Sequence, residues 1–366
     1  MDHQLPLLLR HYAALSPSSP ALLPAPPFPT SRQLSLPTTQ QWLVDHLLEH
    51  DRDQQDGERG GAAWKKVFWR RVVKAVEDGF DVRRADGDEQ VDDEEVHPDI
   101  LETMVEYLSS GAAAGAPGVS TRTYYWGDLS KAPSEWESLH TREEGRLISG
   151  GTTGLRTWQA CIALSNHLIA APHVLERSSR IIELGAGVGL LSLVAARLWR
   201  AAGRRGRIVA TDVDEKVLDV LTSNLELNEL DDLARCSKLD WELAADLDAH
   251  GDELSQWERQ AFDDGRAELI LGADIVYDPS LAVLLAATLA WLLRPATDVD
   301  TPPPQALIAG TVRNESTWAT FLDECERRRL RVERVELEEP PQQGGLVGAE
   351  GWEGEGEVRL VHLTAL

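Results

Sequence analysis

The chain has 366 residues, of which 42% are hydrophobic and 27% are charged, and this composition is typical of a soluble globular protein with one or two domains. Its formal net charge of −25 argues against a nucleic acid or an anionic membrane as the main partner. A basic protein would be attracted to so acidic a chain. Solubility is an alternative explanation for the net charge, because many of the acidic residues fall in loops.

The cysteines and the N-terminus bear on the compartment. Cys161, Cys236 and Cys325 are far apart, and no cysteine–histidine group has the spacing of a zinc site. We therefore expect no metal and a reducing, cytoplasmic compartment. The first ten residues lack the basic start and the long apolar core of a signal peptide, and no stretch has the apolar length of a transmembrane helix.

The first third of the chain predicts a small helical unit. Residues 1–36 are rich in proline and serine, and we expect little regular structure there beyond one or two helical turns. Apolar residues then recur at helical spacing in three segments. These predicted helices run from a cap at Thr38 or Thr39 to about His50, from Trp64 to Val76, and from Ile100 to Leu108.

Polar segments separate these helices. The acidic run from Asp86 to Glu95 predicts a mobile loop, and the Ala/Gly stretch from Gly111 to Gly118 predicts a linker. We therefore expect a helical, partly disordered unit over residues 1–118 and a second domain over residues 119–366. Lysines and arginines on the helix around Trp64 fit either a solvated face or a contact with a partner.

A glycine turn organises the second domain. The stretch RIIELGAGVGLLSLV, residues 180–194, predicts an apolar strand, a turn through Gly185, Gly187 and Gly189, and an apolar helix. Glycine at these positions permits a positive φ and lets a ligand approach bare backbone. The turn is a candidate cofactor site, and a tight strand-to-helix turn without a ligand is the alternative.

The spacing of the glycines separates two cofactors. The dinucleotide fingerprint is G-x-G-x-x-G, and Leu190 stands where that fingerprint has its third glycine. Glu183 precedes the turn, and a carboxylate there repels phosphate but attracts a cation. S-adenosylmethionine carries an ammonium and a sulfonium and no phosphate, so this stretch favours S-adenosylmethionine over a nicotinamide cofactor.

Strands and helices alternate after the turn, as a parallel sheet with helical crossovers requires. A second strand, 207–211, is followed by Asp212, an acidic residue that can accept both ribose hydroxyls, although the neighbouring Asp214 is an alternative. The third strand, 236–239, is followed by Trp241, which can pack on an adenine ring. The polar stretch 242–266 predicts an acidic loop or a short helical insertion.

The fourth strand, 267–272, leads into a second cluster of candidate residues. Ala273 is small enough to let a cofactor pass, and Asp274 and Tyr277 follow at the edge where open α/β sheets bind ligands. Further strands are expected at 306–312, 331–337 and 358–364, and the last two predict an antiparallel hairpin. The fold class is therefore α/β, with a Rossmann-like sheet of seven strands as in class I methyltransferases.

A Gly/Thr loop from Ser149 precedes a predicted helix over residues 157–170. Trp158 lies near the start of this helix and a short distance before the glycine turn. On position alone, its ring fits a cofactor wall and a core tryptophan equally well.

Four segments together resemble the seven-β-strand protein-lysine methyltransferases, and most closely the family that modifies eukaryotic elongation factor 2. They are residues 149–158, 183–189, 239–241 and 272–280. The resemblance covers residues 121–366, and the chain departs from the family in enlarged acidic loops at 86–95, 242–266 and 340–357. It implies a protein substrate, elongation factor 2. We also expect a monomer without direct contact to nucleic acid or membrane.

The resemblance also implies roles for individual residues. Cofactor contacts are implied along two strand ends, the glycine turn and both tryptophans, namely at Trp158, Gly185, Ala186, Gly187, Asp212, Trp241 and Ala273. Asp274 and Tyr277 are implied at the entrance for lysine.

The resulting hypothesis is in-line attack of a neutral lysine amine on the cofactor methyl group. Asp274 would attract the incoming ammonium, and Asp274 or Tyr277 would orient the amine lone pair. The structural alternative is that Asp274 caps the following helix and Tyr277 packs against it. A small-molecule methyltransferase and a non-catalytic interaction protein on the same fold are the rival functions.

Overall fold

Two compact units make up the protein in this computed structural model. The structure describes residues 3–17, 19–25, 27–53, 61–109, 119–144, 153–263, 265–295, 302–340, 344–348 and 356–366. The first unit comprises residues 1–138 and 346–352, and the second comprises residues 139–345 and 353–366. The boundary expected from the sequence follows residues 110–118, which lie outside the described residues, and residues 119–138 group with the first unit.

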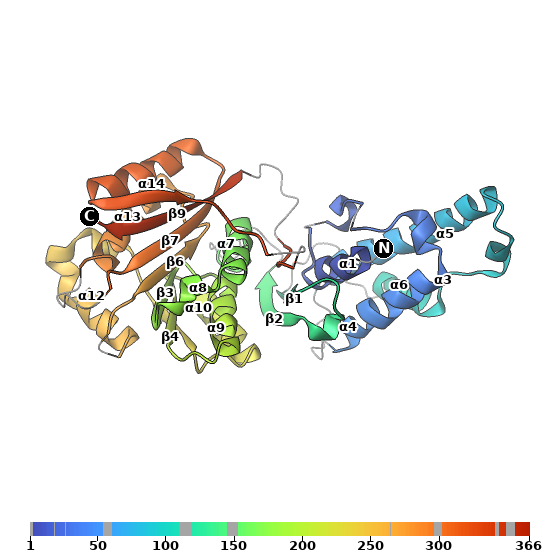
Figure 1. Cartoon of the computed structure of the whole chain (residues 1–366), viewed down its shortest axis with the longest axis horizontal. Coiled ribbons are helices and arrows are strands. Elements are labelled where there is room, and N and C mark those ends of the chain that lie inside the picture. The colour runs from blue at the N-terminus through green and yellow to red at the C-terminus, as the bar shows by residue number, and fades with distance from the viewer. Residues whose placement is uncertain are drawn as a thin grey trace. The chain divides into compact units, whose positions relative to one another are not determined.

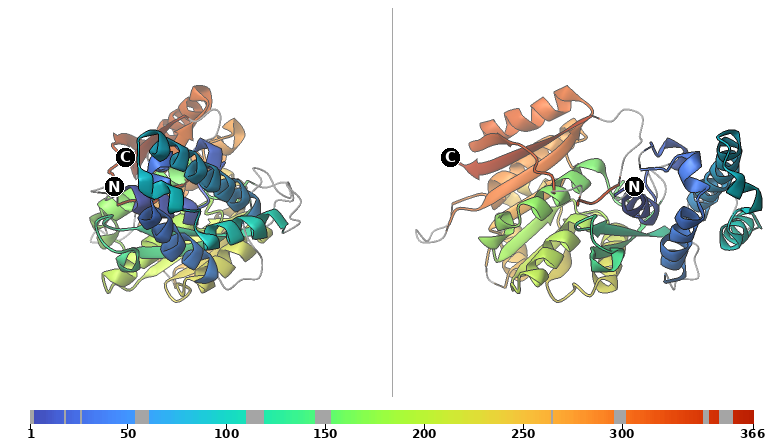
Figure 2. Two further views of the ribbon diagram at one scale, coloured as in Figure 1. Left: turned by 90° about the vertical axis from the view of Figure 1, so that its right-hand side faces the viewer. Right: turned by 45° about the vertical axis from the view of Figure 1, so that its right-hand side comes forward.

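The first unit is mainly helical, and α5 and α6 lie side by side in it (Figure 2). Its helices are α1 (Gln4–Ala13), η1 (Pro20–Leu22), α2 (Ser31–Leu34), α3 (Pro37–Leu43), the π-helical turn η2 (Val44–Leu48), α4 (Glu49–Asp53), α5 (Ala62–Ala85), η3 (Glu89–Asp93), α6 (Pro98–Ser109) and η4 (Pro133–Glu135). It also contains strand β1 (Val119–Trp126).

The expectation of little regular structure in residues 1–36 is wrong. Helix α1 has ten residues, and Leu8 and Tyr12 on it are fully buried. The Tyr12 ring packs against Phe68 and Trp69 of α5 with ring centroids 4.9 and 5.8 Å apart. Burial against a distant aromatic helix therefore overrides the local composition.

Two further expectations in this unit need correction. Helix α3 begins at Pro37, whose preset φ suits the first helical position, so neither Thr38 nor Thr39 is its cap. The acidic run contains the short helix η3, and Arg83 on α5 forms ion pairs with Asp88 and Glu94 on either side of it.

The second unit alternates strands and helices. Its strands are β3 (Arg180–Leu184), β4 (Arg207–Asp212), β5 (Ala234–Lys238), β6 (Leu269–Ala273), β7 (Gln305–Val312), β8 (Leu330–Val335) and β9 (Glu357–Ala365). Its helices are α7 (Gln159–Ala170), α8 (His173–Glu176), α9 (Leu190–Ala201), α10 (Glu215–Leu227), α11 (Glu242–Ala245), α12 (Leu247–Ala261), α13 (Pro279–Leu292) and α14 (Glu315–Arg327). The stretch 242–266 is thus mostly helical.

These strands form one sheet of seven in the order β5-β4-β3-β6-β7-β9-β8. Strand β3 pairs in parallel with β4 on one side and with β6 on the other. Strand β9 inserts antiparallel between β7 and β8. The α/β fold class with a terminal antiparallel hairpin is confirmed.

Helices cover both faces of this sheet (Figure 1), with α7, α9 and α10 on one face and α12, α13 and α14 on the other. Helix α13 has a predominantly apolar sequence and packs into the core beside α14 and α11. The chain turns back at β3, since β4 and β5 lie on one side of it and β6 and β7 on the other. Open α/β sheets bind ligands at the carboxyl ends of strands flanking such a switch point.

Strand β2 (Glu137–Glu144) carries the chain into the second unit, and α10 holds its second half. Asn228 accepts a hydrogen bond from the His140 N–H at 2.8 Å, and Asn224 accepts one from the Arg142 N–H at 2.8 Å. Two asparagines about one helical turn apart thus hold this half of β2 to the end of α10. Within the described part of the chain, no helix is long and apolar enough to cross a membrane.

Candidate active site

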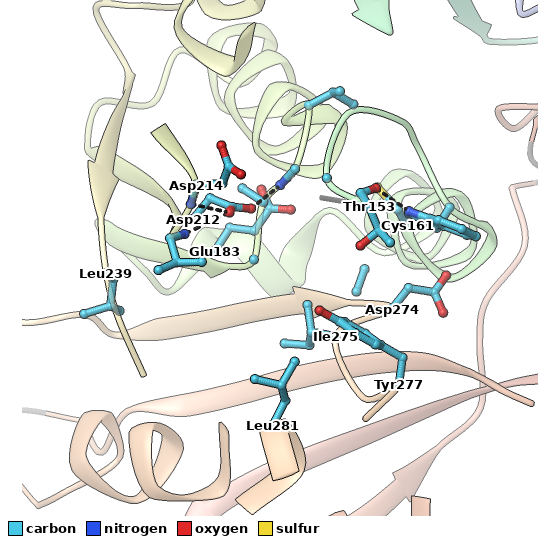
Figure 3. Close-up of a pocket in the computed structure, with 18 of the residues that line it drawn as sticks. Thr153, Cys161, Glu183, Asp212, Asp214, Leu239, Asp274, Ile275, Tyr277 and Leu281 are labelled. Carbon is cyan, nitrogen blue, oxygen red and sulfur yellow. Dashed lines mark hydrogen bonds between the residues drawn. The ribbon is translucent and has the colours of Figure 1, made fainter. Parts of the chain in front are cut away.

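A cavity of about 510 Å³ lies at the carboxyl ends of β3, β4 and β6 (Figure 3). Nearly all the candidate residues from the sequence line it, drawn from segments far apart in the chain: Trp158, Glu183, Gly185, Ala186, Gly187, Asp212, Trp241, Ala273, Asp274 and Tyr277. The size falls within the range of about 300–1,000 Å³ that is usual for small-molecule sites.

The glycine turn forms one wall of the cavity. Gly185 and Gly187 have φ values of +60° and +54°, which residues other than glycine rarely adopt. A Cβ atom on Gly185 would lie 2.7 Å from Cγ2 of Ile275, and one on Gly187 would lie 2.9 Å from the carbonyl oxygen of Gly154. Both positions therefore require bare backbone.

Gly189 does not line the cavity. It is the N-cap of α9, with a φ of +91°, and a Cβ atom there would collide with Leu221 of α10. The third glycine therefore serves the close packing of two helices, and its predicted place among the cofactor contacts lacks support from this geometry.

Glu183 ends up beneath the turn, with only 2% of its surface exposed. Its Oε2 accepts hydrogen bonds from the backbone N–H of Ser192, at 2.9 Å, and from the Ser192 hydroxyl. Burial raises the pKa of Glu183 to about 8, so the neutral acid predominates at pH 7 in the ligand-free chain. The prediction assumed a charged carboxylate, whereas attraction of a cation here requires Glu183 to lose a proton.

Asp212 and Asp214, the two alternatives for ribose binding, have different surroundings. Asp214 is the N-cap of α10 and accepts hydrogen bonds from two backbone N–H groups in the first turn. Asp212 accepts a hydrogen bond from the Gly187 N–H at 3.3 Å and so links β4 to the glycine turn. Burial raises the pKa of Asp212. Both line the cavity, but Asp214 is already committed to its helix.

Each of the two tryptophans directly precedes a helix. Trp241 precedes α11, and its ring lies near Gly185, where an added Cβ atom would lie 3.6 Å from it. Trp158 precedes α7, and its Nε1 donates to the Thr153 carbonyl at 3.1 Å. The Trp158 ring also has the guanidinium of Arg313 within 5.4 Å. Both rings line the cavity, so Trp158 is part of a wall and not only of the core.

Asp274 and Tyr277 leave β6 in different directions. The Asp274 carboxylate points away from the cavity, and the Tyr277 ring points into it (Figure 3). Tyr277 is 58% exposed, its hydroxyl hydrogen-bonds with Thr153, and partial burial raises its pKa. The Asp274 side chain is 4% exposed. Asp278, not Asp274, caps the following helix α13.

Several residues at this site were not predicted from the sequence. Thr153, Cys161 and Ile275 line the cavity, and the Gly/Thr loop was the one local signal that pointed to Thr153. Glu143, on β2, is buried and accepts a hydrogen bond from the Thr157 N–H at 2.9 Å. No local pattern marks Glu143, because its partner lies on another element.

Comparisons with known proteins identify the family of this chain. Residues 137–326 match a family described as "Lysine methyltransferase". Protein-lysine N-methyltransferase EFM3 of Chaetomium thermophilum is 32% identical over 253 residues, covering 66% of this chain and 69% of that protein. Human protein-lysine N-methyltransferase EEF2KMT is 29% identical over 245 residues, covering 66% and 68%. A SAM-dependent O-methyltransferase structure from Thermotoga maritima aligns with a TM-score of 0.36 and 17% identity, covering 58% and 68%.

The cavity fits S-adenosylmethionine. Bare backbone at Gly185 and Gly187 admits a ligand at close range, and indole rings are available for an adenine. The Asp212 carboxyl at the end of β4 suits a ligand with ribose hydroxyls. With one family matching about half of its length, the chain belongs to the lysine methyltransferases, and its cofactor is S-adenosylmethionine.

Proposed function

We propose that this chain methylates the ε-amine of a lysine in a protein, and that this protein is translation elongation factor 2 in the cytoplasm. The names of the relatives in Chaetomium and human support a protein substrate. The observation that carries the proposal is Tyr277, a residue that is 58% exposed and lines a cavity suited to S-adenosylmethionine. The hydroxyl of a half-exposed tyrosine that lines the cavity can meet a side chain that enters from outside.

The cofactor would lie across the strand ends. Trp241 would face the adenine, and Asp212 would accept hydrogen bonds from the ribose hydroxyls. Gly185, Ala186 and Gly187 would allow close approach along the backbone. Ala273 would leave room beside the end of β6, and Trp158 would close the opposite wall.

S-adenosylmethionine, when bound, supplies a methyl group activated by the sulfonium. The lysine must arrive as a neutral amine, while free lysine has a pKa of about 10.4. A narrow and partly dry opening favours the neutral form, and the proton can leave to water before the amine docks. The Tyr277 hydroxyl would then orient the amine lone pair, and alignment would supply much of the acceleration.

The test uses the purified full chain, S-adenosylmethionine with a labelled methyl group, and purified eukaryotic elongation factor 2. Mass spectrometry of the labelled protein should place the label on one lysine, and the Asp212→Ala variant should give far less label. Repeating the reaction with a cell extract separates the alternatives. Label on a different protein would refute the assignment of elongation factor 2, and label only on small molecules would refute a protein substrate.

A further inference from the structure

Helix α7 begins without a cap of its own. Its N-cap residue is Trp158, whose side chain makes no capping hydrogen bond because an indole has a donor and no acceptor. Serine, threonine, aspartate or asparagine usually occupies this position and satisfies a free backbone N–H. The same tryptophan forms a wall of the cofactor cavity, so the cap has been given up for an aromatic surface.

A first carboxylate compensates from β2. Glu143 is 2% exposed, and its Oε2 accepts a hydrogen bond from the backbone N–H of Thr157, immediately before Trp158. Its Oε1 accepts hydrogen bonds from the hydroxyls of Thr157, at 2.8 Å, and Thr141, at 2.7 Å. Both oxygens of Glu143 therefore hold the entry to α7.

A second carboxylate compensates from the end of β6. Oδ2 of Asp274 accepts a hydrogen bond at 2.7 Å from the backbone N–H of Ala160, two residues after Trp158. Its Oδ1 accepts one at 2.8 Å from the Thr311 N–H on β7, and the Thr311 hydroxyl donates to Oδ2 at 3.1 Å. Arg313 lies 3.6 Å from Oδ1. The carboxylate thus joins the first turn of α7 to the sheet.

We propose that Glu143 and Asp274 form a carboxylate clamp that positions Trp158 against the cofactor, and that Asp274 acts through this clamp instead of receiving the substrate ammonium. Two negative groups at the N-terminal end of a helix also interact favourably with its dipole. Asp274 itself has a φ of +54°, an unusual value for a residue with a side chain, which aims its carboxylate at Ala160 and Thr311.

The consequence for turnover rests on the proposed function, but the clamp itself can be measured without any substrate. The variants are Asp274→Asn and Glu143→Ala in the full chain, with Thr311→Val as a milder change that removes one donor. An asparagine at position 274 cannot accept from the N–H groups of both Ala160 and Thr311, because its NH₂ must face one of them. Glu143→Ala removes both acceptor oxygens from the entry to α7. Asp278→Asn is the matched control, since asparagine caps a helix as well as aspartate does and Asp278 caps α13.

Two readouts test the clamp: hydrogen exchange at the backbone amides of residues 157–161, and the affinity for S-adenosylhomocysteine by calorimetry. Loss of a charge-assisted hydrogen bond should speed exchange there and weaken binding by about tenfold in Asp274→Asn and Glu143→Ala. Thr311→Val should do so to a smaller extent, and Asp278→Asn should match the wild type.

The overturning result is clear-cut. The Asp274→Asn variant could show the same hydrogen exchange and the same affinity for S-adenosylhomocysteine as the wild type, together with a higher KM for the protein substrate. In that case Asp274 contacts the substrate and the clamp assignment is wrong. If Asp274→Asn does not fold, Thr311→Val decides, and unchanged exchange at Ala160 in that variant refutes the clamp. Failure to methylate elongation factor 2 would leave both readouts intact and would bear on the proposed function alone.

Discussion

Ser192 donates both its backbone N–H and its hydroxyl to a single oxygen, Oε2 of Glu183. The serine lies in the first turn of α9, so the glutamate ties the end of β3 to the helix on the far side of the glycine turn. This carboxyl is buried, and its pKa is raised from 4.5 to about 8. Its protonation therefore couples pH to stability.

We expect Glu183→Gln to remove part of the pH dependence of stability. Between about pH 4.5 and pH 8 the folded chain keeps a proton on Glu183 that the unfolded chain loses. Stability must then fall as pH rises through this window, with a slope of at most about 1.4 kcal/mol per pH unit. Glutamine keeps an acceptor for Ser192 and does not titrate. The unfolding free energy of the variant should therefore fall less than that of the wild type between pH 5.5 and 7.5.

Urea unfolding of the ligand-free chain at these two pH values measures the effect. Glu226→Gln, an exposed change on α10, controls for loss of one carboxylate elsewhere. Equal pH slopes in wild type and Glu183→Gln would contradict the assignment.

Gly185→Ala should weaken the binding of S-adenosylmethionine by tenfold or more, roughly the value of one lost favourable contact. The new methyl group would stand between Ile275 and Trp241, inside the cofactor cavity. Gly203→Ala is the matched control, because Gly203 has a similar φ of +64° but no neighbour within 4 Å of an added Cβ. Calorimetry should find the wild-type affinity for S-adenosylmethionine in the control. An equal loss of affinity in both variants would show that backbone strain, and not the lost space in the cavity, causes the effect.

Tyr277→Phe should lower the kcat for methyl transfer by about tenfold, because it removes the one hydrogen bond that orients the amine. The ring remains, so the dissociation constant of S-adenosylmethionine should change little. Thr153→Val removes the hydrogen-bond partner of Tyr277 without removing its hydroxyl. If both variants lose activity equally, the hydroxyl acts by holding the loop of Thr153 and not by meeting the amine.

Asp51→Ala should destabilise the first unit by about 3–5 kcal/mol, because it leaves a buried lysine without its partner. Asp51 forms an ion pair with Lys65 at 2.6 Å and accepts hydrogen bonds from the hydroxyls of Tyr12 and Tyr107. The side chains of Asp51 and Lys65 are only 15% and 10% exposed.

Hydrogen exchange in α1 and α5 reports the stability of this unit separately from the second. The control is Asp78→Ala, which breaks an exposed ion pair with Lys74 and should change stability by less than about 0.5 kcal/mol. A comparable effect of both substitutions would show that the buried network around Asp51 contributes nothing special.

Local sequence was sufficient for the elements around the glycine turn. Helix α9 covers Leu190–Ala201, as its apolar spacing predicts, and the seven-stranded order with its terminal hairpin follows the predicted alternation of strands and helices. The family resemblance and the cofactor also came from short motifs. Such features can be predicted from the sequence because they depend on backbone conformation and on residues adjacent in the chain.

Tertiary structure alone decided what the buried polar groups do. Asp274 hydrogen-bonds to Ala160 and Thr311, which are 114 and 37 residues away, and nothing in the order of residues indicates those partners. The same holds for the protonation of Glu183, which depends on desolvation, and for α1, whose Tyr12 is buried against α5. Hydrogen bonding and burial act through space, so a chain's local pattern can name a candidate residue while only its packing determines the role.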